Sequence, residues 1–290
     1  MLIVPERLAV ACRGTPERRT WLEMLPHAIR GLQDRWSLSL GTPFESRDGS
    51  CAWVAPAVRR DGTRAILKLG MPHMEATHEL QGLRFWDGNA TVRLLESDAD
   101  LNAMLLEPCE PGTALRELPE LEQDVVVAGL LRRLWRKPAA PHPFRPLSAM
   151  TTHWADETRA AVARWPGDAG LIREGLRLLA ELPRSSSDDV LLTTDLHAGN
   201  VLRAQREPWL AIDPKPLVGE REFGVAPIVR SFELGHSREE VRGRLDRLSS
   251  DLGLDRQRAR LWSMAQTVAW SIGSEYLPRH IETAQWLLEM

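Results

Sequence analysis

The sequence predicts an α+β protein in two parts, a small part built on an antiparallel sheet and a larger, mainly helical part. Residues 36–107 alternate apolar and polar side chains in strand-like fashion, with one helical interruption. From 120 onward most of the chain has helical spacing instead. The Pro- and Gly-containing stretch "EPCEPG" separates the two patterns. We therefore expect domains at 1–107 and 108–290.

The smaller part is expected to begin with a helix over 16–36, because apolar residues recur at helical spacing and Thr15 can cap the first turn. Strand-like stretches follow, and the Asp-Gly pair at 61–62 between two of them is a hairpin signal. A helix is predicted over 72–87, and two short strands come after it. The sheet should therefore contain about five strands.

The larger part is predicted from a series of helical patterns. These patterns lie at 120–136, 150–165, 167–183, 237–249, 254–273 and 278–290. Between the third and fourth patterns, "NVLRAQREPWLAID" reads as a hairpin of two short strands around a polar turn.

Composition and charge exclude several functional classes. The net charge of the 290 residues is −3, so a nucleic-acid partner is not expected. No apolar run approaches the roughly 18 residues of a membrane span, and "MLIVPERLAVACRGTP" lacks the pattern of a secretory leader, so we expect a cytoplasmic protein without a membrane partner. The three cysteines, Cys12, Cys51 and Cys109, are far apart, which argues against a disulfide framework and a zinc site.

Lys68 lies at the centre of the apolar strand "RAILKLG", in a chain where only three of 37 basic residues are lysine. A buried ammonium group needs a partner, and a compact point charge is suited to meeting phosphate oxygens. Glu79 or Glu75, one turn apart on the following predicted helix, can supply the partner. We choose Glu79, because Leu83 and Trp86 follow it at core-packing spacing. The alternative is a strand lysine that faces solvent.

A second group of polar residues is Asp195-x4-Asn200, followed by Asp213. Asn200 and Asp213 fall at the two facing ends of the predicted hairpin, which brings an amide oxygen and a carboxylate together beside Asp195. Such oxygens are ligands for Mg²⁺, and a neighbouring carboxylate can orient or deprotonate a hydroxyl nucleophile. The alternative is a turn stabilised by side-chain bonds to its own backbone.

Two loops could bind a nucleotide through their backbone. In "LLEPC", Pro108 has no N–H, which leaves the carbonyl of Glu107 and the N–H of Cys109 for an adenine edge. In "GTPFESRDGS", Gly49 and Ser50 could fold over phosphates. The alternatives are a connector that binds nothing and a plain hairpin turn.

Together these residues resemble the aminoglycoside phosphotransferases, which share the protein-kinase-like fold, and in particular the streptomycin 6-kinase and hydroxyurea phosphotransferase branch. The segments that carry the resemblance are "DGTRAILKLG", "HELQGLRFWDG", "VRLLE", "LLEPCEPGTAL", "TDLHAGNVL" and "REPWLAIDPKPLVGE". They extend from 61 to 220 in the family's order, and the last two are specific.

The resemblance implies a bilobal kinase that uses ATP and Mg²⁺ to phosphorylate a small-molecule hydroxyl, in an aminoglycoside such as streptomycin or in hydroxyurea. Asp195 would be the catalytic base, and Asn200 and Asp213 would hold Mg²⁺. Lys68, positioned by Glu79, would contact the α- and β-phosphates. The segment 107–109 would be the adenine hinge.

The chain departs from the family at Thr193-Thr194, where many members have His-Gly before the catalytic aspartate. That histidine supports the loop and does not react, so we expect activity to survive. His197 is interpreted as a loop-packing residue. Lys215, two residues past the metal ligand, either neutralises phosphate charge or lies on a solvated turn.

Carboxylates are needed to bind a polycationic aminoglycoside. Candidates are Glu233, Asp251, Asp255 and Glu275, each of which could instead be a surface charge. Three rival functions remain: a kinase of another small metabolite, a nucleotide-binding pseudokinase and a protein-directed kinase. The intact Lys, Asp, Asn and Asp set argues against the pseudokinase, and the short distance from Asp213 to the next helical pattern leaves little room for an activation segment.

Overall fold

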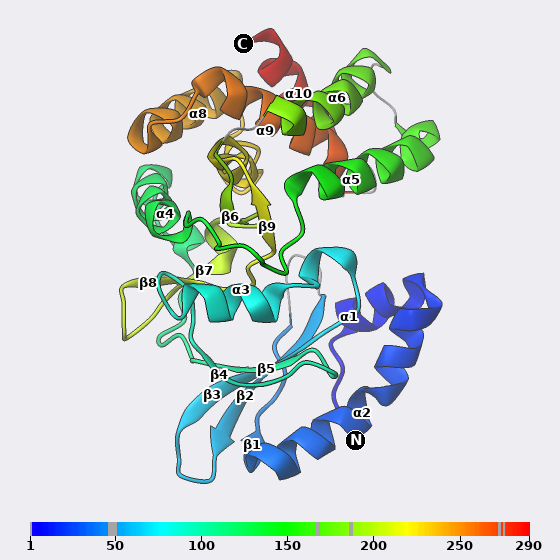
Figure 1. Ribbon diagram of the computed structural model, residues 1–290, viewed down its shortest axis with the longest axis vertical. Helices are drawn as coiled ribbons and strands as arrows, with labels where there is room; N and C mark the ends of the chain where they lie inside the picture. The colour runs from blue at the N-terminus through cyan, green and yellow to red at the C-terminus, as the bar shows by residue number, and fades with distance from the viewer. Residues whose placement is uncertain (1, 46–50, 166–168, 186–187, 272–273, 275) are drawn as a thin grey trace. The chain divides into compact units, whose positions relative to one another are not determined.

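The computed structural model describes residues 2–45, 51–165, 169–185, 188–271, 274 and 276–290 (Figure 1). The chain divides into two compact units. The first unit comprises Met1–Gly112 and Ala204–Leu210, and the second comprises Thr113–Arg203 and Ala211–Met290. Within the described ranges, no helix has the length and apolarity needed to cross a membrane.

The first unit contains one antiparallel sheet with strand order β1-β2-β3-β5-β4. The number of strands agrees with the prediction. Its strands and helices are α1 (Glu6–Ala11), α2 (Pro16–Trp36), β1 (Leu38–Leu40), β2 (Ala52–Arg59), β3 (Arg64–Gly70), α3 (Glu79–Trp86), β4 (Leu94–Asp98) and β5 (Ala103–Leu106).

Helix α2 packs its apolar side chains into the core of this unit. Its first turn is capped as predicted, since the Thr15 hydroxyl accepts a hydrogen bond from the Arg18 N–H. Leu25, Ile29 and Leu32 of the helix are almost fully buried in one cluster with side chains of β2 and β3. The helix therefore covers the sheet that carries Lys68, and the periodic pattern at 16–36 is explained by this contact.

The helix expected over 72–87 begins only at Glu79, so this prediction was wrong in its first half. A short 3-10 turn, Met74–Ala76, precedes it. His73 before this turn is extended, and His78 between the turn and α3 has φ of −115° and ψ of 17°, outside the helical region, so the turn and the helix are not continuous. Glu75 and Glu79 consequently do not share a helix face.

The second unit is mainly helical and contains the two-stranded sheet β6-β9, and the chain leaves and re-enters this unit through the hairpin β7-β8. Helix α9 lies among α6, α7, α8 and α10, and most of its residues are buried (Figure 1). The helices of the second unit are α4 (Glu120–Leu134), α5 (Leu147–Ala161), α6 (Ala169–Glu181), α7 (Ala226–Val229), α8 (Arg238–Leu252), α9 (Arg256–Ser271) and α10 (Leu277–Glu289), and its strands are β6 (Val190–Thr193), β7 (Val201–Arg203) and β9 (Pro216–Gly219). Strand β8 (Trp209–Ala211) has its first two residues in the first unit.

The six helical patterns predicted from the sequence correspond to α4, α5, α6, α8, α9 and α10, with ends shifted by a few residues. The predicted hairpin is also present, as β7 and β8. The short helix α7 follows a 3-10 turn at Arg221–Val225 and was not predicted. With four residues it is too short for a periodic pattern to reveal.

Candidate active site

Lys68 and Glu79 form a buried ion pair inside the first unit. Lys68 lies on β3, opposite Val54 of β2 and Met104 of β5, and its side chain is only 8 % exposed. Its Nζ lies 2.5 Å from Oε1 of Glu79, the first residue of α3, which is 2 % exposed. The predicted pairing is therefore confirmed, and the alternative of a solvent-facing lysine is excluded. If one of two charges this deeply buried is removed, the other is left without a partner away from water.

The β6-β9 ladder brings two distant segments of the second unit together. Thr193 of β6 is paired with Pro216 of β9. Just beyond this pair, the backbone N–H and the hydroxyl of Thr194 both donate to the carbonyl of Lys215, at 3.2 and 2.7 Å. Residues 195 and 215 therefore lie close together at the end of the ladder. A hydroxyl that anchors the loop thus stands at 194, the position of the glycine in His-Gly, whereas the buried hydroxyl of Thr193, at the position of the histidine, has no hydrogen-bond partner among the described residues.

Lys215 bridges the two carboxylates that the sequence singled out. Its Nζ donates to Oδ2 of Asp195 and to Oδ2 of Asp213, each at 2.9 Å. Burial lowers the pKa of Lys215, but the attraction of Asp213 and Asp195 outweighs it, so the pKa lies well above the ordinary value. The side chain is 8 % exposed. The expected alternative of a solvated turn is therefore wrong.

Asn200 completes this group from the end of a short 3-10 turn. Its side-chain amide donates to the Asp195 carbonyl at 2.9 Å and approaches Oδ2 of Asp195 at 3.4 Å. Its own carbonyl accepts from the N–H of Ile212 at 2.9 Å, which holds it beside Asp213. Asp213 has a left-handed backbone with φ of 50°, a conformation that costs energy for a non-glycine residue and is common at functional sites.

The oxygen-rich character of this group fits Mg²⁺. Carboxylate and amide oxygens are hard donors, and an ammonium already lies between the two carboxylates, so the position attracts a cation. Nowhere in the described part of the chain do three or more His, Cys, Asp or Glu side chains form a metal-binding cluster. A site with so few protein ligands suits a metal that also takes phosphate oxygens and water.

A second set of contacts braces the loop between Asp195 and Asn200. Nη1 of Arg116 lies 2.6 Å from Oε1 of Glu233, and Nδ1 of His197 lies 3.8 Å from Oε2 of the same carboxylate. His197 also accepts from the N–H of Gly199 at 3.2 Å, which agrees with a loop-packing role. A Cβ placed on Gly199 would lie 1.8 Å from Nη2 of Arg116. A larger residue at 199 would therefore displace the Arg116 guanidinium that pairs with Glu233.

The structure describes the connector at 107–109 but not the residues predicted to approach phosphates, Gly49 and Ser50. The Glu107 carboxylate takes a bidentate contact from Arg206 in the tip of the β7-β8 hairpin, at 2.8 and 2.9 Å, within the first unit. This side-chain role was not predicted, and it leaves the predicted use of the Glu107 carbonyl unaffected. Gly49 and Ser50 lie outside the described residues.

Cys109 is a half-buried thiol with a pKa raised to about 12, because burial and the nearby Glu107 charge outweigh the opposing effect of Arg206. Since only the thiolate is nucleophilic, the fraction that can react is small at any pH below this value and rises with pH. We expect Cys109 to be alkylated about 10- to 100-fold more slowly than the exposed Cys51 at pH 8, after allowing for the higher nucleophilicity of a high-pKa thiolate.

This expectation is measured by iodoacetamide labelling with peptide mapping between pH 7 and 10. The Cys109 rate should still be rising at pH 10, whereas labelling of Cys51 provides the comparison within the same sample. Equal rates for the two cysteines at pH 8 would show that the Cys109 thiol is not perturbed.

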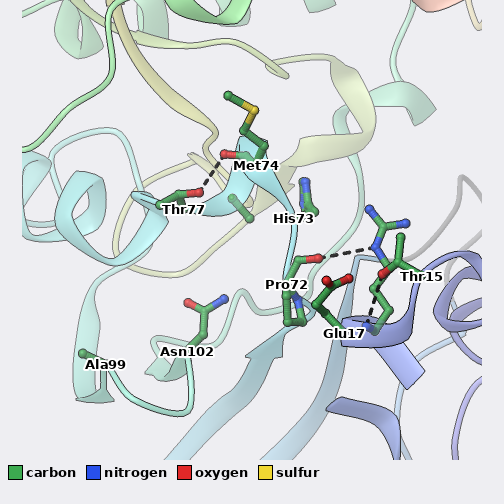
Figure 2. A pocket seen from close by; sticks show the side chains of 10 residues that line it. Thr15, Glu17, Pro72, His73, Met74, Thr77, Ala99 and Asn102 are labelled. Atoms are coloured by element: carbon green, nitrogen blue, oxygen red, sulfur yellow. Dashed lines mark hydrogen bonds between the residues drawn. The ribbon is translucent and has the colours of Figure 1, made fainter. Parts of the chain in front are cut away.

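A surface pocket of about 510 Å³ also lies in the first unit, between the start of α2 and the segment that joins β3 to α3 (Figure 2). Thr15 and Glu17 line one side, and Pro72, His73 and Met74 line another. None of the residues that line it is a predicted site residue. Within the first unit, neither Lys68 nor Glu79 contributes to its lining.

Sequence reasoning did not single out the residues that hold the site in place. These are Arg116, which pairs with Glu233, Arg206, which pairs with Glu107, and Thr194, which was noted only as a departure. Their partners lie far away in the sequence, so spacing gives no signal for the two arginines. For Thr194, the pair of threonines at the end of a buried strand was the one signal in the sequence that a side chain there has a structural role.

The buried Lys–Glu pair on the sheet of one unit, and the Asp, Asn and Asp group on the loops of the other, define a protein-kinase-like phosphotransferase. A family profile described as aminoglycoside/hydroxyurea antibiotic resistance kinase matches residues 35–273. The chain belongs to this family and is therefore a small-molecule kinase.

Individual relatives agree with this assignment. The chain is 40 % identical to streptomycin 6-kinase of Streptomyces griseus over 282 residues, covering 93 % of this chain and 91 % of that protein. It is 40 % identical to hydroxyurea phosphotransferase of Kitasatospora aureofaciens over 287 residues, covering 95 % and 82 %. Among solved structures, an aminoglycoside phosphotransferase in ternary complex with AMP-PNP and hygromycin B has a TM-score of 0.59 at 12 % identity, covering 90 % and 96 %. This likeness confirms the protein-kinase-like fold.

Proposed function

We propose that the protein transfers the γ-phosphate of ATP to a hydroxyl of an aminoglycoside, with streptomycin as the first candidate, and so inactivates the antibiotic. The observation that carries the proposal is the grouping of Asp195, Asn200 and Asp213 at one end of the β6-β9 ladder. A carboxylate that can receive a hydroxyl proton thus lies beside oxygens that can hold a metal. The similarity to streptomycin 6-kinase supports this acceptor.

The roles follow from charge and hydrogen bonding. Asp195 orients the acceptor hydroxyl and takes its proton as the oxygen attacks phosphorus. Asn200 and Asp213 hold Mg²⁺, which neutralises the charge of the phosphate oxygens when it is bound. Phosphoryl transfer needs mainly positioning and charge neutralisation, and these side chains can provide both.

The nucleotide is assigned to the first unit. Lys68 contacts the α- and β-phosphates, and Glu79 fixes the direction of its ammonium group. The backbone of the segment 107–109 binds the adenine edge, and Gly49 and Ser50 approach the phosphates. A related fold binds the ATP analogue AMP-PNP, which supports ATP as the donor. We include a cytoplasmic location in the proposal, because ATP is a cytoplasmic phosphate donor.

Glu233 is the acceptor carboxylate that we propose among the four candidates. It lies beside the catalytic loop, since it contacts His197 and Arg116. Asp251 and Asp255 are exposed, and Asp255 accepts from the N–H of Arg258 in the first turn of α9, as a capping residue does. Glu275 lies outside the described residues.

The segment that carries Glu233 is held firmly in the second unit. Arg244 is fully buried and donates to the carbonyls of Val229 and Gly235, at 2.9 and 2.8 Å. It also pairs with Glu120 at 2.9 Å, and Glu120 accepts from the N–H of Gly235. These bonds fix the chain on both sides of Glu233, so its carboxylate is pre-organised for a cationic group.

The test is a coupled ATPase assay with streptomycin, hydroxyurea and choline as acceptors, with mass spectrometry of the product. We expect streptomycin to accelerate ATP turnover and to gain one phosphoryl group. Acceleration by hydroxyurea alone would replace the acceptor in the proposal. If none of the three accelerates turnover while ATP still binds, the proposed acceptor is wrong, and the kinase of another metabolite and the pseudokinase become the alternatives to test.

The role of Glu233 is tested by Glu233→Gln in the same assay. The KM for streptomycin should rise roughly tenfold, as expected for the loss of one charge contact, while the KM for ATP stays unchanged. An uncharged acceptor such as hydroxyurea should be unaffected. Asp251→Asn, which removes an exposed carboxylate in α8, is the matched control.

A further inference from the structure

Lys215 occupies an unusual position for a lysine in this protein. It is one of three lysines in the chain, and its ammonium lies at 2.9 Å from a carboxylate oxygen of Asp195 and of Asp213. Lys137, by comparison, is exposed, and its Nζ lies 3.9 Å from Oδ1 of Asp188, a looser contact. Of these two lysines of the second unit, only Lys215 has a buried ammonium group shared by two carboxylates in the described structure.

The contact is fixed by the backbone. Both the N–H and the hydroxyl of Thr194 hold the Lys215 carbonyl, so the lysine cannot move away from Asp195 without breaking the end of the β6-β9 ladder. The side chain, however, is a flexible four-carbon stem whose ammonium can turn toward other acceptors. The position of the main chain is therefore set, while the charge can be redirected.

Without a cation, the two carboxylates would repel each other, and the protein supplies its own cation in this place. From this geometry we propose that Lys215 is a positioning residue that occupies the divalent-cation position between Asp195 and Asp213 and that Mg²⁺ must displace its ammonium from Asp213. The inference rests on the proposed function in one respect, since it takes Asp213 as a metal ligand.

Two consequences follow. The protein without nucleotide should bind Mg²⁺ weakly, because the ammonium already neutralises the carboxylates. The nucleotide phosphates offer the displaced ammonium a new acceptor, so the metal and the nucleotide should bind more tightly together than separately. Lys215 then keeps Asp195 and Asp213 in place before the substrates arrive and makes metal binding depend on the nucleotide.

The experiment is a titration of the nucleotide-free, full-length protein with MgCl₂ at constant ionic strength, followed by calorimetry and by the melting temperature. We expect Lys215→Met and Lys215→Gln to lower the dissociation constant of Mg²⁺ roughly tenfold, the scale of one charge contact. Both variants should melt at lower temperature than wild type without metal and should recover when MgCl₂ is added. Lys215→Arg keeps the charge and should behave like wild type.

Two controls locate the effect. Lys137→Met removes an exposed lysine and should leave Mg²⁺ binding unchanged. Adding Asp213→Asn to Lys215→Met should abolish the gain in affinity. The inference is wrong if Lys215→Met and Lys215→Gln bind Mg²⁺ no more tightly than wild type, or if they stay unfolded at high MgCl₂. A gain in affinity in a protein that phosphorylates no acceptor would leave this inference intact and overturn the proposed function.

Discussion

Replacing Asp195 by asparagine is expected to lower kcat for acceptor phosphorylation by about a hundred- to ten-thousand-fold, the range that general-base catalysis contributes. Asparagine has nearly the same shape but cannot accept the proton of the hydroxyl. The contacts that hold the loop to Lys215 and Asn200 should survive, because they use the N–H and hydroxyl of Thr194, the side-chain amide of Asn200 and the carbonyls of Asp195 and Lys215, and not the Asp195 carboxylate. Binding of AMP-PNP should stay within a few-fold of wild type.

Steady-state kinetics and AMP-PNP titration measure the two expectations separately. The matched control is Asp251→Asn, an exposed aspartate on α8 whose change should leave kcat and KM as they are. An Asp195→Asn protein that phosphorylates the acceptor at the wild-type rate would show that another group takes the proton of the hydroxyl. Loss of AMP-PNP binding together with turnover would indicate instead that the substitution disturbs the metal or nucleotide contacts.

Much of the fold could be predicted because its signals are local. The helix at 16–36 was predicted with its bounds and its Thr15 cap, since apolar spacing and a capping residue both lie within that segment. The β7-β8 hairpin was predicted from one continuous stretch as well. The helix at 72–87 was wrong in its first half, because the extended backbone at His73 and the non-helical backbone at His78 are not visible in the spacing of apolar residues.

The site was predicted in its residue types and in the contact between Lys68 and Glu79, but not in its other contacts. A lysine in an apolar strand must find a partner, and the nearest acidic helix residue with a buried face was Glu79. For Lys215 the sequence left two alternatives open, because its environment depends on the pairing of β6 with β9 and not on its neighbours in the chain. The same applies to Arg116 and Glu233, which lie far apart in the sequence and in contact in the fold.

The buried pair of Lys68 and Glu79 should have the largest effect on stability. Replacing Glu79 by alanine removes the carboxylate 2.5 Å from the Lys68 ammonium, where the two side chains are only 2 % and 8 % exposed. Breaking a buried pair from one side costs about 3–5 kcal/mol, because the remaining charge loses its partner away from water. Urea denaturation should show this loss in the free energy of unfolding.

The double variant Lys68→Met/Glu79→Leu separates structure from catalysis. Apolar side chains of similar volume remove both buried charges, and such replacements are often neutral or stabilising, so the free energy of unfolding should return to near the wild-type value. Phosphotransfer should remain lost, because no ammonium is left to meet the α- and β-phosphates. Lys137→Met, at an exposed lysine, should change neither quantity. A stable and fully active double variant would remove Lys68 from the nucleotide site, whereas a stable variant with a greatly raised KM for ATP and low kcat would place its charge on the phosphates.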